Sequence, residues 1–185
     1  MNYCSRCGHE VEVKVPPGDH LPRHVCPACG TIHYENPRLV VGCIPQWQDQ
    51  ILLCKRAIHP RLGYWTLPAG FMENGETTRQ CAARETLEES EAQVEIGEML
   101  SLISVPYIHQ VHAFYLARLL EPKFAPTAES SEVRLYREDE IPWDDIAFPT
   151  VGFTLRCYFE DRKAGAFRLH THDILTRPPA PKPPD

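Results

Sequence analysis

The sequence lacks three features that would each indicate a particular class of protein. It contains no run of about 18 apolar residues, the length that a membrane-spanning helix needs. Its opening residues, MNYCSRCGHE, do not form the apolar core of a secretory signal. It has no excess of positive charge, because its formal net charge is −6, and it shows no internal repeat. We therefore expect a cytoplasmic protein with no membrane partner and no nucleic-acid partner.

The length and the composition suit one ordinary domain with a small appendage. The chain has 185 residues, of which 43% are hydrophobic, enough for a core. We place domain boundaries at 1–36, 37–165 and 166–185, and the final residues, RPPAPKPPD, are typical of a disordered tail. Four scattered cysteines in apolar contexts indicate buried thiols in a reducing compartment: Cys43, Cys54, Cys81 and Cys157.

The first 36 residues contain two CxxC pairs. Cys4 and Cys7 are separated by eighteen residues from Cys26 and Cys29, the spacing of a four-cysteine zinc ribbon. A redox CxxC is the competing interpretation. Four thiolates would leave no open position on a Zn²⁺ ion, so we expect the zinc to stabilise this module without taking part in catalysis. The ribbon has few basic residues, and we predict a packing role that supports a homodimer.

A cluster of acidic residues lies between residues 70 and 92, in GFMENGETTRQCAARETLEESEA. No Gly or Pro occurs in it after residue 75, which predicts a helix over 77–91. On that helix Glu85, Glu88 and Glu89 stand at i, i+3 and i+4, so their carboxylates share one face. Like charges at this spacing destabilise a helix unless a cation binds them. Hard oxygen ligands suit Mg²⁺ or Mn²⁺, and a solvated acidic face is the alternative.

The same segment resembles the signature box of the Nudix hydrolases. That pattern is Gly, five residues, Glu, seven residues, Arg-Glu, two residues and Glu-Glu, followed by any residue and a closing Gly. The positions that match are Gly70, Glu76, Arg84, Glu85, Glu88 and Glu89. Two positions depart from it, because Thr86 occupies an apolar position and Glu91 stands where the box has its closing Gly.

The resemblance implies an α/β fold, the Nudix α/β/α sandwich with a mixed sheet, preceded by the ribbon. The pattern of apolar residues agrees with this fold: it predicts strands over 38–44, 51–55, 64–67, 94–105, 109–119 and 132–137 and a second helix over 149–163. By resemblance, Glu85, Glu88, Glu89 and the backbone carbonyl of Ala69 would bind catalytic Mg²⁺ or Mn²⁺.

The resemblance also assigns supporting roles. Glu76 and Arg84 would form an ion pair that fixes the loop of Gly70 against the helix. The general base would come from the box, as Glu85, or from a later loop, where Glu132 is our first choice and Glu129 the second.

The substrate is the least determined feature at this level. Nudix proteins with zinc ribbons resemble either NADH pyrophosphatases or enzymes that cleave ADP-ribose or FAD to release AMP. The first group carries a Ser-Gln-Pro-Trp-Pro-Phe-Pro signature after the box, and we expect no match to it in residues 100–115, LSLISVPYIHQVHAFY. We therefore expect ADP-ribose or FAD, with NADH or NAD-capped RNA as the alternative and a non-catalytic zinc-ribbon adaptor as an alternative of another class. The candidates for contacting this dinucleotide-type substrate are Arg38, Arg56, Arg61 and Tyr107.

Overall fold

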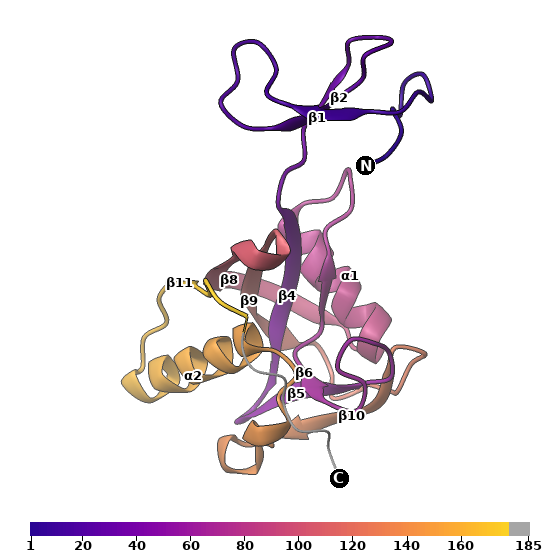
Figure 1. The fold of residues 1–185 in the computed structure, drawn as a ribbon. Coiled ribbons are helices and arrows are strands. Elements are labelled where there is room, and N and C mark those ends of the chain that lie inside the picture. Colours follow the sequence, from indigo (N-terminus) through magenta and orange to yellow (C-terminus); the bar gives the residue numbers. More distant parts are fainter. Residues whose placement is uncertain (178–185) are drawn as a thin grey trace. The chain divides into compact units, whose positions relative to one another are not determined.

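The computed structural model describes residues 1–177, so the proline-rich tail lies outside the described residues. The chain divides into two compact units, the first comprising Met1–Asn36 and the second beginning at Pro37 (Figure 1). The first unit is an antiparallel sheet in the order β1 (Glu12–Lys14), β2 (Arg23–Val25) and β3 (Ile32–His33). Its two CxxC pairs lie in the turns outside these strands.

The second unit contains one mixed sheet whose main path runs β10-β5-β4-β9-β8-β11. Strand β4 (Arg38–Trp47) lies near its centre, antiparallel to β5 (Gln50–Arg56) and parallel to β9 (Gln110–Leu119). Strands β8 (Val94–Val105) and β10 (Ser130–Tyr136) pair antiparallel with β9 and β5. Two short strands, β6 (Trp65–Thr66) and β7 (Ala69–Phe71), pair with β5 and β4.

One helix covers each face of this sheet, as Figure 1 shows for α1 (Thr78–Ser90) and α2 (Pro149–Ala164). The alternation of side chains along the strands divides the core into two layers. Cys81 and Ala82 of α1 pack with Val41, Ala113 and other residues of one face. Phe114, adjacent in sequence to Ala113, points to the opposite face and packs against α2. The predicted α/β/α sandwich with a mixed sheet is therefore confirmed.

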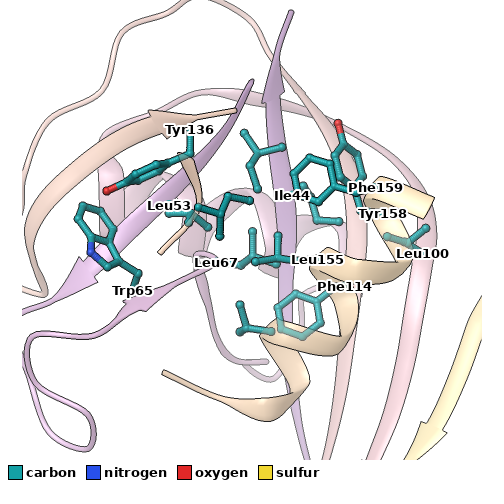
Figure 2. Close-up of a cluster of buried hydrophobic side chains, with 13 residues drawn as sticks. Ile44, Leu53, Trp65, Leu67, Leu100, Phe114, Tyr136, Leu155, Tyr158 and Phe159 are labelled. Atoms are coloured by element: carbon teal, nitrogen blue, oxygen red, sulfur yellow. The ribbon is translucent and has the colours of Figure 1, made fainter. Parts of the chain in front are cut away.

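The larger core lies between the sheet and α2, and Figure 2 shows its side chains. Val151, Leu155, Tyr158 and Phe159 of α2 form the buried stripe that helical spacing predicts. Burying each such side chain stabilises the fold by about 1.5–3 kcal/mol. This packing fixes the start of α2, including Thr150, against the sheet.

Short elements complete the second unit. Three 3-10 turns are η1 (Pro106–Ile108), η2 (Glu138–Glu140) and η3 (Trp143–Asp145). Strand β11 (His170–Asp173) pairs parallel with β8, so the sheet continues past residue 165, where we expected the domain to end. The sequence HTHD has no apolar alternation that could predict a strand. It is instead anchored by a polar contact, in which His170 lies 2.8 Å from the buried Asp161.

The four scattered cysteines are all buried, as expected. Among the residues that the structure describes, no helix is both long enough and apolar enough to cross a membrane.

Candidate active site

The helix α1 begins where local hydrogen bonds favour it. Thr77 is the N-cap: its side chain accepts a hydrogen bond from the Gln80 backbone, and the Gln80 side chain accepts one from the Thr77 backbone. Thr86, in the apolar position of the box, is buried and donates its hydroxyl to the Ala82 carbonyl at 2.7 Å. The helix ends at Glu91, whose φ of 56° is the left-handed conformation that favours glycine.

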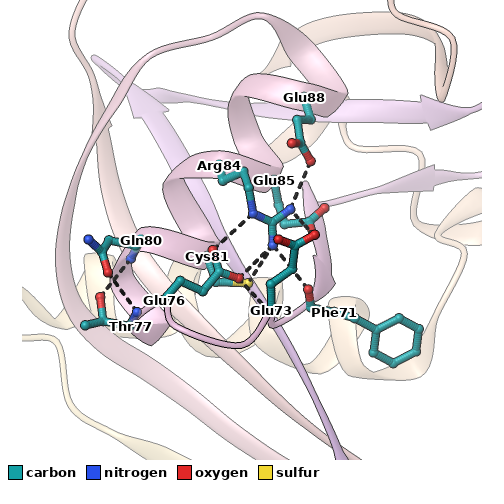
Figure 3. A network of polar contacts seen from close by, with 9 residues as sticks. All are labelled: Phe71, Glu73, Glu76, Thr77, Gln80, Cys81, Arg84, Glu85 and Glu88. Carbon is teal, nitrogen blue, oxygen red and sulfur yellow. Dashed lines mark hydrogen bonds and ion pairs between the residues drawn. The ribbon is translucent and has the colours of Figure 1, made fainter.

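Arg84 joins the loop to the helix through a network of ion pairs, drawn in Figure 3. Its guanidinium donates to both carboxylate oxygens of Glu76, at 3.1 and 2.8 Å, and to the Phe71 carbonyl at 3.2 Å. It also donates to one oxygen of Glu85 at 2.8 Å and to one oxygen of Glu88 at 2.9 Å. The Arg84 contacts hold the pKa of Glu76 at about 2, below its ordinary value. The ion pair between Glu76 and Arg84 is present, and each of Glu85 and Glu88 keeps one oxygen that Arg84 does not bind.

Glu85 and Glu89 contact two consecutive backbone positions of the loop. A Cβ atom on Gly70 would lie 2.2 Å from an oxygen of Glu85, so the Glu85 carboxylate occupies space that only a glycine leaves free. The Ala69 backbone N–H donates to Glu89 at 3.2 Å. The peptide at Ala69 and Gly70 therefore forms a wall against which both carboxylates pack.

The three box carboxylates differ in burial. The Glu89 residue is 6% exposed, whereas the Glu88 side chain is 55% exposed. Burial raises the pKa of Glu89 to about 8, against the opposing hydrogen bond from Ala69, and the negative charges of Glu85 and Glu129 raise it further. Burial also raises the pKa of Glu85. Glu85 and Glu89 are largely buried and Glu88 is exposed. Carboxylate oxygens are the ligands of a divalent cation such as Mg²⁺ or Mn²⁺, which would compensate the desolvation of the two buried groups.

A cavity of about 500 Å³ is lined by both Ala69 and Gly70. Its lining residues come mainly from β4, β7 and β9 and from the segment 148–151 at the start of α2. Two arginines line it, each over an aromatic ring: Arg38 lies 4.6 Å from the Phe71 ring centre and Arg56 lies 5.2 Å from that of Phe148. The cavity thus combines apolar surface with two positive charges next to the acidic cluster.

The two units match two family descriptions. Residues 2–35 match the Nudix N-terminal zinc-ribbon family, and residues 36–154 match the NUDIX domain. The chain is a Nudix hydrolase. The family match extends over both the ribbon and the acidic helix, so the chain belongs to the Nudix family throughout the two units.

The relatives of this Nudix hydrolase include one solved structure that resembles nearly all of it. A NUDIX hydrolase from Nitrosomonas europaea is 54% identical, with a TM-score of 0.93, over 95% of this chain and 100% of that one. Curated relatives named NAD-capped RNA hydrolase NudC are 32% identical in Edwardsiella ictaluri and 30% identical in Escherichia coli. Each of these alignments covers 88% of this chain but only 60% of the relative, so the chain spans about 60% of the length of these relatives.

The two candidates for the general base lie in different surroundings. Glu132, our first choice, is on β10 and lies 3.2 Å from Lys55 in an ion pair, with 54% of its side chain exposed. Glu129 lies in the loop before β10, where its backbone carbonyl accepts a hydrogen bond from Ala57. Its negative charge contributes to the raised pKa values of Glu85 and Glu89. The fold therefore places Glu129 within the electrostatic field of the acidic cluster and pairs Glu132 with a lysine.

Two of the four predicted substrate contacts line the cavity, and two do not. Arg38 and Arg56 line the cavity. Arg61 is not among its lining residues and lies 5.9 Å from the Tyr64 ring centre, and Tyr107 precedes the lining residue Ile108 in η1. The lining residues that sequence reasoning missed include Gln110, His112 and Thr150. Gln110 and His112 are two residues apart on one strand and therefore share a face, which could have indicated that both line a cavity. The segment is instead assigned to the core because apolar residues surround these two.

The ribbon cysteines are arranged as a closed metal site. Contacting sulfur atoms lie 3.4 to 3.7 Å apart: Cys7 to Cys26, Cys7 to Cys29 and Cys4 to Cys29. A tetrahedral Zn²⁺ with Zn–S bonds of about 2.3 Å requires sulfur separations of about 3.8 Å, so the donor set fits. Among residues 1–177 it is the only His, Cys, Asp and Glu cluster whose ligand atoms all lie within 4.8 Å of one another. The structure supports structural zinc over a redox pair.

Proposed function

We propose that this Nudix hydrolase cleaves the diphosphate bond of NADH or a related adenine dinucleotide. The observation that carries the proposal is the shared wall formed by Ala69 and Gly70. Its backbone contacts the carboxylates of Glu85 and Glu89, and the same two residues line a cavity with two arginines. A diphosphate at this wall would lie between the metal-binding carboxylates and the Arg56 guanidinium, with one nucleoside in the cavity.

Glu85, Glu88, Glu89 and the Ala69 carbonyl would hold the catalytic Mg²⁺ or Mn²⁺. When bound, such cations neutralise phosphate oxygens and lower the pKa of a bound water. Arg84 orients Glu85 and Glu88 through one oxygen of each. Arg56 lines the cavity, its charge interacts with those of Glu89 and Glu129, and it would bind a phosphate oxygen.

We assign the general base to Glu129, with Glu132 as the second candidate. Glu129 would accept the proton of the attacking water while a P–O bond of the diphosphate breaks. The products of NADH would be AMP and reduced nicotinamide mononucleotide. The assignment is supported by the electrostatic coupling of Glu129 to both buried carboxylates, whereas Lys55 neutralises Glu132.

NADH is preferred here over ADP-ribose and FAD because of the curated relatives. Those relatives are named for NAD-capped RNA hydrolysis. The sequence also keeps part of the NADH signature: Ser104 and Pro106 occupy its first and third positions, and Tyr107 places an aromatic residue where the signature has Trp. The expectation that residues 100–115 carry no match to the signature therefore overlooked these three positions. The net charge of −6 argues for a free dinucleotide over an RNA, whose backbone binds positive surfaces.

The test is a product-resolved assay with Mg²⁺ or Mn²⁺ on NADH, NAD⁺, NAD-capped RNA, ADP-ribose and FAD. We expect AMP and reduced nicotinamide mononucleotide from NADH, with the highest kcat/KM in the series. If AMP is released from ADP-ribose or FAD but not from NADH, the substrate is ADP-ribose or FAD, as the sequence analysis expected. Release of the 5′-phosphorylated RNA at a higher kcat/KM than NADH would make the capped RNA the substrate.

Three variants test the catalytic assignments, and the wild type tests the non-catalytic adaptor role. Glu89→Gln should lower kcat by at least about 100-fold, because it removes a charged ligand from the buried cluster. Glu129→Gln and Glu132→Gln form a matched pair: only the first should lower kcat strongly. A folded wild-type protein that released no AMP from any dinucleotide would favour the adaptor.

A further inference from the structure

Three polar side chains form a chain of hydrogen bonds along one wall of the substrate cavity. His112 Nδ1 lies 3.1 Å from the Thr150 hydroxyl, and His112 Nε2 lies 2.9 Å from the Gln110 side-chain oxygen. All three residues line the cavity that also contains Arg38 and Arg56. None of them ligates a metal or transfers a proton in the function proposed above, so their arrangement needs a separate explanation.

The neutral state of His112 fixes the direction of these hydrogen bonds. Burial lowers the pKa of His112 to about 4, so the ring is neutral at pH 7 and has one N–H donor and one acceptor. The Gln110 amide is oriented with its oxygen toward Nε2, and in this orientation Nε2 carries the proton and donates to Gln110. Nδ1 is then the acceptor for the hydroxyl of Thr150, a buried residue that is 3% exposed.

This direction leaves the Gln110 amide nitrogen as an oriented donor. Within residues 1–177 that nitrogen has no hydrogen-bond partner. Gln110 is paired in register with Arg38 of β4, whose guanidinium lies over Phe71, and its side chain is half-buried. The amide therefore presents two N–H bonds, and a carbonyl oxygen with a second lone pair, beside an aromatic and cationic surface.

We propose that Gln110 is a specificity-determining residue that recognises the ring of the bound dinucleotide, with His112 and Thr150 as positioning residues. This rests on the proposed function. An amide recognises an edge on which an amino group stands beside an acceptor, as it does for adenine in nucleic acids. Adenine offers its amino group and N7, and reduced nicotinamide offers its carboxamide. Both rings are neutral, which suits a cavity with two guanidinium groups.

The test compares NADH with two analogues, one with hypoxanthine in place of adenine and one with an acetyl group in place of the carboxamide. Wild type should discriminate about 10- to 100-fold in kcat/KM against the analogue whose edge Gln110 contacts, because a bidentate contact gives selectivity of this order. Gln110→Ala should raise KM for NADH and remove that discrimination, with kcat changed less than KM. If Gln110→Ala removes the discrimination against the hypoxanthine analogue, Gln110 contacts adenine. If it removes the discrimination against the acetyl analogue, Gln110 contacts nicotinamide.

A matched pair tests the positioning role. Thr150→Val removes the hydroxyl and should reduce the discrimination, whereas Thr150→Ser keeps it and should restore wild-type selectivity. Thermal unfolding of all variants checks that the fold persists. The proposal is overturned if Gln110→Ala retains the wild-type ratio between NADH and both analogues. An inactive wild type would instead refute the proposed function, so the two failures are distinguishable.

Discussion

Replacing Gly70 by alanine tests whether the position of the Glu85 carboxylate matters for catalysis. The added methyl carbon would lie 2.2 Å from one Glu85 oxygen and 2.3 Å from its carboxyl carbon. Ordinary contact begins at 3.4 Å, so the carboxylate must retreat by about 1.2 Å. Glu85 can do this only by changing its position relative to Glu89 and to the metal site.

The expected effect falls on activity and not on stability. A misplacement of about 1 Å in a catalytic group lowers turnover on the order of 100-fold. The free energy of unfolding should change by no more than about 1 kcal/mol, because Gly70 is not in the left-handed region and alanine restricts the unfolded chain. A side chain that is 12% exposed can still turn outward, which relieves the overlap.

The assay is steady-state hydrolysis of NADH with saturating Mg²⁺ or Mn²⁺, combined with urea unfolding. Gly152→Ala is the control, because its added Cβ would meet only the end of the Arg156 side chain at 3.5 Å. It should retain full activity and gain up to about 1 kcal/mol, as expected for replacing a glycine within a helix. Wild-type turnover in Gly70→Ala would refute the reasoning, since Glu85 would then act equally well from another position.

Three further predictions concern stability. Arg84 holds the pKa of Glu76 at about 2, so this ion pair stabilises the fold above pH 4.5 and is lost as the pH falls toward 2. Glu76→Gln should therefore cost about 1–3 kcal/mol at pH 7, and urea titrations at several pH values should show the gap closing in acid. Glu91→Gly should raise the free energy of unfolding by about 1 kcal/mol at unchanged activity, because it relieves a left-handed residue; lower stability would contradict this. Chelation should release about one zinc per chain and unfold the ribbon, seen as lost amide dispersion in residues 1–36, and a ribbon that stays folded without metal would contradict it.

Local pattern was sufficient for most elements of the fold. The helix of residues 77–91 and the strands around it were predicted within a few residues, because Thr77 caps the helix and alternation marks the strands. The prediction missed β7, in a segment that we expected to be a loop, and β11, whose HTHD sequence carries no apolar signal. The strand state of β11 depends on pairing with β8 and on the contact of His170 with Asp161, which are 9 residues apart.

The sequence by itself determined the acidic box and the zinc cysteines, because their spacing along one helix or in two knuckles already encodes which side chains meet. It ranked Glu132 above Glu129 without any information on the groups around either. Glu129 lies in the loop before β10, and Glu132 lies on the strand. Only the tertiary structure placed Lys55 beside Glu132 and the charge of Glu129 in the field of Glu89. It also built the cavity from β4, β7, β9 and the start of α2, because contacts between elements distant in the chain have no local sequence signal.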